Sequence, residues 1–425
     1  MNKLKYTFLL FFTFSSGIIF SQISTNSPYS RFGLGNLNNS SSADQLGMGG
    51  SSVVYNNPDV INFNNPATYS SFKAKSFLFT TSLNSSASRF TTSNNIQYEN
   101  NTSFSKIALG FPVNQYISVS SGLLPFSNVG YQLDYNDTEN FLEDTVSISS
   151  IGNGGLSKYY LGASVKLHKT LSVGVNASYL FGGLSRNKTA DFNNSSIFNV
   201  SSVNRTNITG VSFETGLLFN TDLSEDNNIS FGLTYNHNVN LNARRTLLGT
   251  TYELNNSLLV IKDTFQNEVE NGTIVLPSKL SAGMMYSSEK WLLLANYSSQ
   301  NWSDYSLTFG KEREDDNLEN SVCVSSGLQY TPEFNSVTKY WKRINYRMGA
   351  RYDKTYLSLK DLQLTEKSLS FGLGLPVKRS NSFYNIGMEV GKQGTTQDKL
   401  IQERFVRFTF GVTFKGLWFV KRKYD

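Results

Sequence analysis

Charged side chains on strand-like segments are the residues of this 425-residue chain that could bind a ligand. Arg347 and Arg351 lie four positions apart in an alternating segment, so an extended strand would point both to one face. A guanidinium group binds a carboxylate through two parallel hydrogen bonds, so the pair predicts a site for an anionic head group. Lys158 and Lys166, on the polar faces of other such segments, are predicted to take part in the same site. These polar faces also carry Lys106, Glu214, Lys279, Glu389 and Arg407. The alternative is structural, with these charges paired to one another and to a plug.

Catalytic and metal chemistry are not expected from this sequence. His168 and His237 are its two histidines and Cys323 is its one cysteine. They fall in segments that should lie far apart, and a hydrolase would need serine, histidine and an orienting group in one constellation. A transition-metal site would need more such ligands. We therefore predict no enzyme, no metal and no cofactor.

The elements that must position the charged residues are strands. Over residues 405–414, Val406, Phe408, Phe410, Val412 and Phe414 share one face, and Arg407, Thr409, Gly411 and Thr413 share the other. About fourteen segments of the chain alternate in this way. Short turns between them alternate with longer polar stretches at about residues 128–155, 185–206, 241–276 and 301–319, which we expect to be external loops. Strands with an apolar outer face and a polar inner face are typical of an antiparallel β-barrel in lipid.

The N-terminus and the composition agree with export. Lys3 and Lys5 precede an apolar stretch that ends before Ser21, which predicts a cleaved signal peptide over residues 1–21. The apolar stretch is too short for the about 20 residues of a spanning helix. Charged residues make up 16% of the chain and aromatic residues 14%, and the net charge of +6 is too mild to predict nucleic-acid binding. We expect a barrel among the lipids of the outer membrane of a Gram-negative bacterium.

Residues 22–72 do not alternate. They are rich in Asn, Ser and Gly, yet they contain apolar residues that a solvated tail would not need. This predicts a hatch folded into the lumen of a barrel formed by residues 73–425. The residues that mark the hatch are Gly33, Gly35, Gly47, Gly49, Gly50, Asn65, Pro66 and Ala67.

Three short motifs in this segment are similar to the FadL-type family of outer-membrane channels for long-chain fatty acids and hydrocarbons. They read Ser-Arg-Phe-Gly-Leu-Gly from Ser30, Leu-Gly-Met-Gly-Gly from Leu46 and Asn-Pro-Ala from Asn65. The resemblance implies a glycine-rich hatch followed by a barrel of fourteen strands. It also implies sideways release of apolar substrates through a kink in the third strand, where this chain has Pro125. Alternatively, the strand ends at Pro125, because proline removes a ladder donor.

Two functions follow from these observations. The first is passive uptake of a hydrophobic small molecule such as a long-chain fatty acid. The second is a non-transporting barrel that binds a protein partner in a secretion or envelope complex, a role that the same family resemblance includes. A continuous apolar tunnel would favour uptake. A filled lumen with an exposed apolar patch outside the membrane would favour partner binding.

Overall fold

The computed structural model describes residues 27–38, 41–93, 95–137, 146–194, 196–255, 258–310, 312–314, 318–378, 380 and 382–418. The signal peptide predicted over residues 1–21 lies outside these residues. The strands are β1 (Asn36–Leu37), β2 (Ser76–Thr91), β3 (Ile96–Pro112), β4 (Ile117–Asp137), β5 (Val146–Lys166), β6 (Leu171–Phe192), β7 (Asn199–Ser224), β8 (Asn227–Asn236), β9 (Val239–Asn255), β10 (Leu258–Leu276), β11 (Lys279–Ser287), β12 (Trp291–Gln300), β13 (Ser306–Phe309), β14 (Glu312–Glu314), β15 (Ser321–Tyr330), β16 (Asn345–Leu359), β17 (Leu362–Pro376), β18 (Phe383–Gln393) and β19 (Gln402–Leu417). The helical elements are η2 (Pro28–Arg31), α2 (Ala43–Leu46), η3 (Pro66–Ser71), η4 (Trp302–Asp304), η5 (Tyr340–Arg343) and η6 (Gln397–Lys399).

The sheet is antiparallel and closes on itself, because β19 pairs with β2. Within the described residues, fourteen strands form the wall of the barrel. The other five are β1, which belongs to the N-terminal segment, and the hairpins β9–β10 and β13–β14 at one end of the barrel. These hairpins leave the wall intact, because β8 pairs directly with β11 and β12 pairs directly with β15. The predicted fold class, an antiparallel barrel of about fourteen strands, is confirmed.

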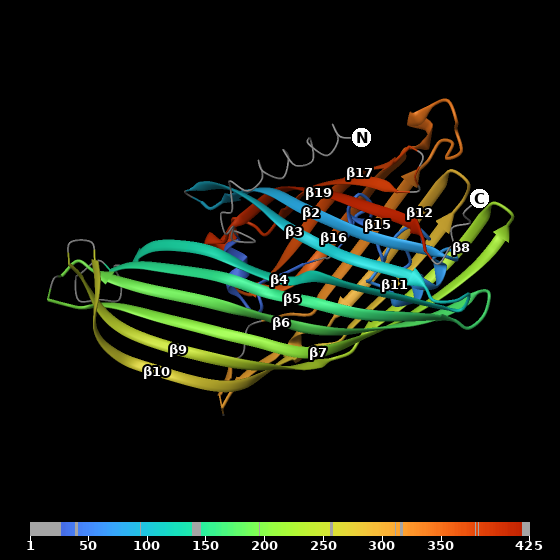
Figure 1. Ribbon diagram of the computed structural model, residues 1–425. Helices are drawn as coiled ribbons and strands as arrows, with labels where there is room; N and C mark the ends of the chain where they lie inside the picture. Colours follow the sequence, from blue (N-terminus) through green and yellow to red (C-terminus); the bar gives the residue numbers. More distant parts are fainter. Residues whose placement is uncertain are drawn as a thin grey trace, which may run out of the picture.

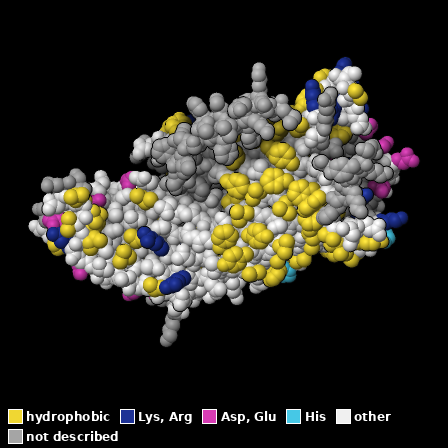
Figure 2. Space-filling view, in the orientation of Figure 1, with side chains coloured by type: hydrophobic (Ala, Val, Ile, Leu, Met, Phe, Trp, Pro, Cys, Tyr) yellow, Lys and Arg dark blue, Asp and Glu magenta, His cyan; other side chains and the backbone are white. Residues whose placement is uncertain are grey.

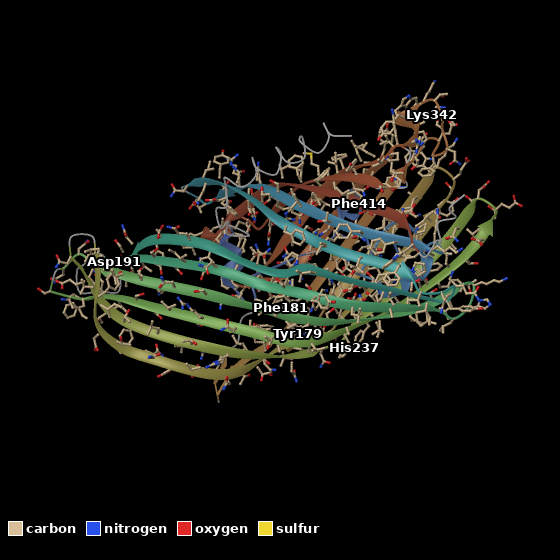
Figure 3. All side chains as sticks on the ribbon, viewed as in Figure 1. Tyr179, Phe181, Asp191, His237, Lys342 and Phe414 are labelled. Carbon is tan, nitrogen blue, oxygen red and sulfur yellow. The ribbon has the colours of Figure 1, made fainter. Side chains whose placement is uncertain are left out.

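The two ends of the barrel differ (Figure 1). We call the end where β2 begins and β19 ends the inner end, and the opposite end the outer end. At the outer end, β4 to β7 run on beyond the rest of the wall together with the β9–β10 hairpin, and we call this part the outer extension. Figure 3 shows Asp191 near its tip, while Lys342 lies in the connection from Thr331 to Ile344 at the inner end.

Side chains alternate across the wall as the last strand predicts. Phe408, Phe410 and Phe414 are about half exposed on the outward face, whereas Thr409 and Thr413 between them are buried inside. Figure 2 shows outward hydrophobic side chains gathered in one zone of the barrel, and charged side chains beyond it on the outer extension. Tyr179 and Phe181 on β6 belong to this apolar belt (Figure 3). Among the described residues, no helix is long and apolar enough to cross a membrane.

The polar stretches that the sequence suggests as loops are largely strands. Most of residues 241–276 forms β9 and β10, and β4 to β7 extend into residues 128–155 and 185–206. Polar residues interrupt the apolar alternation here, but the backbone ladder continues, and the inward side chains Val129, Ile208 and Leu241 belong to a buried apolar cluster. The connection of residues 331–344 at the inner end is also longer than the neighbouring turns, and it contains η5.

The N-terminal segment fills the barrel (Figure 1, dark blue). Its helix α2 contacts β17, β18 and β19, and its helical turn η3 contacts β5, β6 and β7 on the opposite side of the wall. Apolar side chains of the segment, among them Met48, Val54 and Ile61, are fully buried. We call residues 27–72, as far as the structure describes them, the hatch.

Candidate functional site: the hatch, the wall opening and the lumen chambers

The Asn-Pro-Ala motif anchors the hatch to the wall. The Asn65 side chain accepts a hydrogen bond from the backbone of Ala67 at 3.0 Å and donates to the carbonyl oxygens of Val53 and of Leu217 on β7. Pro66 starts η3, where a missing N–H group costs nothing. The motif therefore fixes the end of the hatch and joins it to β7 just before β2 begins.

Glycines allow the hatch backbone to lie directly on the wall. Gly49 has a φ of +70°, and a Cβ atom there would lie 2.7 Å from the carbonyl oxygen of Ala350. A Cβ atom on Gly349 of β16 would in turn lie 2.2 Å from the Gly49 nitrogen. Gly47 meets Gly372 of β17 in the same way. The glycines of the second motif therefore serve a close backbone contact, which a side chain on either partner would prevent.

The wall opens between β3 and β4. Their ladder covers only Ile107–Pro112 against Ser118–Leu123, although both strands continue toward the outer end. Pro125 lies two residues beyond the end of this ladder, at a register shift in the β4–β5 ladder, and β4 runs on to Asp137. The alternative that the strand ends at Pro125 is therefore wrong, and the proline lies at a bulge.

The hatch contributes a strand to this opening. Its strand β1 pairs with Ser127 and Asn128 of β4, and the Asn38 backbone donates to the carbonyl of Phe126 at 2.9 Å. Gly35, with a φ of +89°, approaches the same edge so closely that a Cβ would lie 2.5 Å from the Asn128 oxygen. Gly33 is held from β6, since Arg186 donates to its carbonyl at 2.7 Å. The first glycine motif thus brings the hatch to the wall opening.

An outer chamber of about 310 Å³ lies above the hatch, next to the wall opening. Its lining is mainly polar and includes Asn36, Pro125, Asn101 and Glu99. An ion network forms one side. Arg351 lies 2.9 Å from Glu366 and 3.2 Å from Asp353, and Arg407 lies 3.2 Å from both Glu366 and Glu389. The structural alternative, charge pairing inside the lumen, thus describes Arg351, Glu389 and Arg407.

A second cavity of about 250 Å³, with both polar and apolar side chains in its wall, adjoins the outer chamber, and Arg351 and Lys279 line both. Lys158 and Glu214 line it. The ring of Phe63, a hatch residue, lies between two lysines, with Lys106 Nζ at 5.3 Å and Lys158 Nζ at 5.6 Å from its centre. Lys106 is buried, and its ammonium group has no hydrogen-bond partner among the described residues. Cation–π contacts therefore join these lysines to the hatch.

An inner chamber of about 190 Å³ lies on the other side of the hatch. Arg347 lines it and donates to Gln329 at 2.7 Å and to Asn385 at 2.9 Å. Burial raises the pKa of the nearby hatch residue Tyr55 to about 12, so its hydroxyl group stays neutral. Lys415 on β19 forms an ion pair with Asp59 of the hatch. Lys166 lies at the inner end of β5 and lines neither the outer chamber with Arg351 nor the inner chamber with Arg347.

Sequence reasoning placed Glu389 on a polar face but missed two other carboxylates of this site. Glu366 bridges both arginines of the network, and Glu403 lies in the same chamber. Their inward positions follow from alternation, but only the register of β16 to β19 shows that they meet Arg351 and Arg407. His168 lies in an exposed inner turn and His237 follows β8, so the histidines stay apart. Among the described residues, no cluster of three His, Cys, Asp or Glu could hold a metal ion.

The fold with its plugged lumen is that of the FadL-type transporters. A FadL homologue from Pseudomonas aeruginosa superimposes with a TM-score of 0.59 at 12% identity, covering 88% of this chain and 98% of that one. The toluene transporter TodX of Pseudomonas putida gives 0.59 at 15% identity over 89% and 99%. The toluene transporter TbuX of Ralstonia pickettii gives 0.58 at 12% identity over 88% and 97%. The predicted resemblance is confirmed at the level of the fold, and these neighbours are channels rather than enzymes.

The chain belongs to the BamG family, because the BamG family model matches residues 3–425. No curated protein matches this chain in sequence.

Proposed function

We propose that this protein is a plugged barrel of the Gram-negative outer membrane that serves as a partner-binding subunit of an envelope complex. Residues 1–21 are its signal peptide, residues 22–72 its hatch and residues 73–425 its barrel. The inner end, with its short turns, faces the periplasm, and the outer extension stands on the cell surface. The apolar belt between the two ends supports the placement in a membrane.

The division of the lumen by the hatch carries this proposal. The outer chamber and the inner chamber share no lining residue, and the hatch backbone lies against β16 and β17 between them. The walls of the outer and inner chambers are rich in Ser, Asn and charged side chains, whereas a site for an apolar ligand is lined mainly by apolar ones. Two separate chambers with such walls favour binding a partner over conducting a hydrophobic solute.

The outer extension offers the exposed apolar surface that a protein partner would need. Strand β10 is exposed on both faces over most of residues 258–271, and its large apolar residues there are Leu258, Leu259, Val260, Ile261, Phe265 and Val269. Beyond its ladder with β13, which covers Gly272–Val275, its described pairing is with β9 alone. Exposed apolar residues on an edge strand outside a membrane are typical of a contact surface.

A photo-crosslinking amino acid in place of Phe265 tests this function in living cells. We expect one discrete adduct whose partner mass spectrometry can identify. The same amino acid at Gln397, an exposed polar position in the connection between β18 and β19 away from the outer extension, should give no adduct. An assembled barrel with equal labelling at Phe265 and Gln397, or with none, would contradict partner binding at this surface.

Uptake of a hydrophobic small molecule, such as a long-chain fatty acid, is the second candidate, and the wall opening beside Pro125 favours it. In this case the hatch would move away from β4, and the basic residues Arg347 and Arg351 would hold a carboxylate. Cells that depend on the protein should then lose uptake of a long-chain fatty acid when both arginines become Gln, and Pro125→Val should slow uptake. Unchanged uptake after deletion of the gene would exclude this substrate.

A further inference from the structure

Four basic residues form a continuous row on the outward face of the barrel, just outside the apolar belt. The strand registers pair Arg89 of β2 with Arg404 of β19, Arg404 with Lys392 of β18, and Lys392 with Lys367 of β17. The next residues in the same register are tyrosines at both ends, Tyr98 beside Arg89 and Tyr352 beside Lys367. We call Arg89, Arg404, Lys392 and Lys367 the cation row. Neighbouring strands are about 4.8 Å apart, so the row spans roughly 14 Å.

This arrangement is unfavourable unless something neutralises it. Like charges directly opposite each other on neighbouring strands destabilise a sheet. None of the described ion pairs includes a member of the cation row, and the carboxylates of Glu366, Glu389 and Glu403 point to the lumen instead. The contacts that the row makes with other residues do little to neutralise its positive charge. Arg404 donates to Gln402 at 3.4 Å, and the Lys367 ammonium lies 5.3 Å from the centre of the Tyr352 ring.

The surface around the row is a groove with two chemical zones. The groove has a volume of about 870 Å³, and all four cations line it. The next outward residues on the membrane side of the row, two positions along each strand, form a second row that is apolar. In register, this row reads Ala87, Val406, Val390, Leu369 and Ala350. A ligand that fits both zones has anionic groups at the outer edge of the membrane and hydrocarbon directly beneath them.

We propose that the cation row binds the phosphate groups of an outer-leaflet lipid whose acyl chains cover the apolar residues below. Lysine and arginine both bind phosphate, and arginine does so through two parallel hydrogen bonds. Because the row crosses four strands, it can contact more than one phosphate of a single head group. The tyrosines at its ends have the amphipathic rings that favour the membrane interface. This site rests on the proposed outer-membrane location but is independent of the partner and of the uptake pathway.

Native mass spectrometry of the purified barrel with added bisphosphorylated lipid A tests the site. The fourfold variant R89Q/K367Q/K392Q/R404Q should bind less lipid, by about fivefold for each cation removed. A control variant, K169Q/K290Q/K339Q/K342Q, removes the same charge at the inner end and should bind like the wild type. Equal binding by wild type and the fourfold variant would overturn the site.

Two further arms separate the sources of phosphate. A phosphate-free lipid with the same acyl chains should bind equally weakly to the wild type and the fourfold variant. Inorganic phosphate should not displace the lipid at equal concentration, and displacement would overturn the assignment to a lipid. If the fourfold variant does not assemble, as judged by the heat-dependent shift of folded barrels on gels, K392Q/R404Q replaces it. This variant should bind roughly 25-fold less lipid, and wild-type binding by it would overturn the site.

Discussion

Arg347 and Arg351 lie on the same face of β16, yet the hatch separates them. Gly349 stands between the two arginines, and the backbone of Gly49 crosses the strand at this position. Arg347 therefore faces the inner chamber and Arg351 the outer one. Alternation places both arginines on one face of the strand. They nevertheless line different chambers, because the hatch lies between them.

This separation predicts unequal effects for the same substitution. Arg351→Gln should lower the free energy of unfolding by about 3–5 kcal/mol, because it leaves Glu366 and Glu389 buried with less compensation. Arg347→Gln should cost about 1 kcal/mol, since its partners Gln329 and Asn385 are neutral. Urea unfolding in detergent micelles measures both, and the double variant should be additive. Similar losses for the two single variants would contradict the separation.

The contact between the hatch and β16 should limit the permeability of the barrel. Gly349→Ala introduces a Cβ atom 2.2 Å from the Gly49 nitrogen, and such overpacking costs about 1–3 kcal/mol. We expect the hatch to shift and small sugars to enter liposomes containing the variant faster than wild type. Gly416→Ala is the matched control, because nothing lies within 4 Å of its added Cβ. Equal swelling rates for both variants would mean that this contact does not hold the hatch.

The ion pair between Asp59 and Lys415 should tie the hatch to the last strand near the inner end. Asp59→Asn leaves the Lys415 side chain, which is 7% exposed, without its anionic partner. We expect faster cleavage of the hatch by a protease added to the detergent-solubilised barrel. The reversed pair D59K/K415D should restore much of the protection. If the reversed pair is cleaved as fast as the single variant, the ion pair does not hold the hatch to β19.

The two faces of β19 should respond differently to a charge. Phe410→Arg puts a cation in the apolar belt and should cost about 2–4 kcal/mol. Thr409→Arg puts the same cation into the polar outer chamber, whose lining includes Thr409, and should be better tolerated. The fraction of heat-resistant folded barrel on a gel reports both. Equal losses would contradict the assignment of the faces.

The sequence alone determines the barrel and its faces. The alternation from Phe405 to Phe414 appears again in the exposures of Phe408, Thr409 and Phe410, because successive side chains of a strand must point to opposite faces. The Asn-Pro-Ala motif similarly places the end of the hatch, because Asn65 and Pro66 form a local turn. These features depend on neighbours in the chain, so they can be read from it.

Only the tertiary structure decides which charges meet. The ion network of Arg351, Glu366 and Arg407 and the cation row from Arg89 to Lys367 both depend on registers across several strands. A shift of one residue in any of these ladders would reverse the faces of a whole strand. The separation of Arg347 from Arg351 depends in addition on a hatch segment some three hundred residues away in the chain. Such contacts are set by the closure of the sheet and the packing of the hatch, and local sequence carries no record of them.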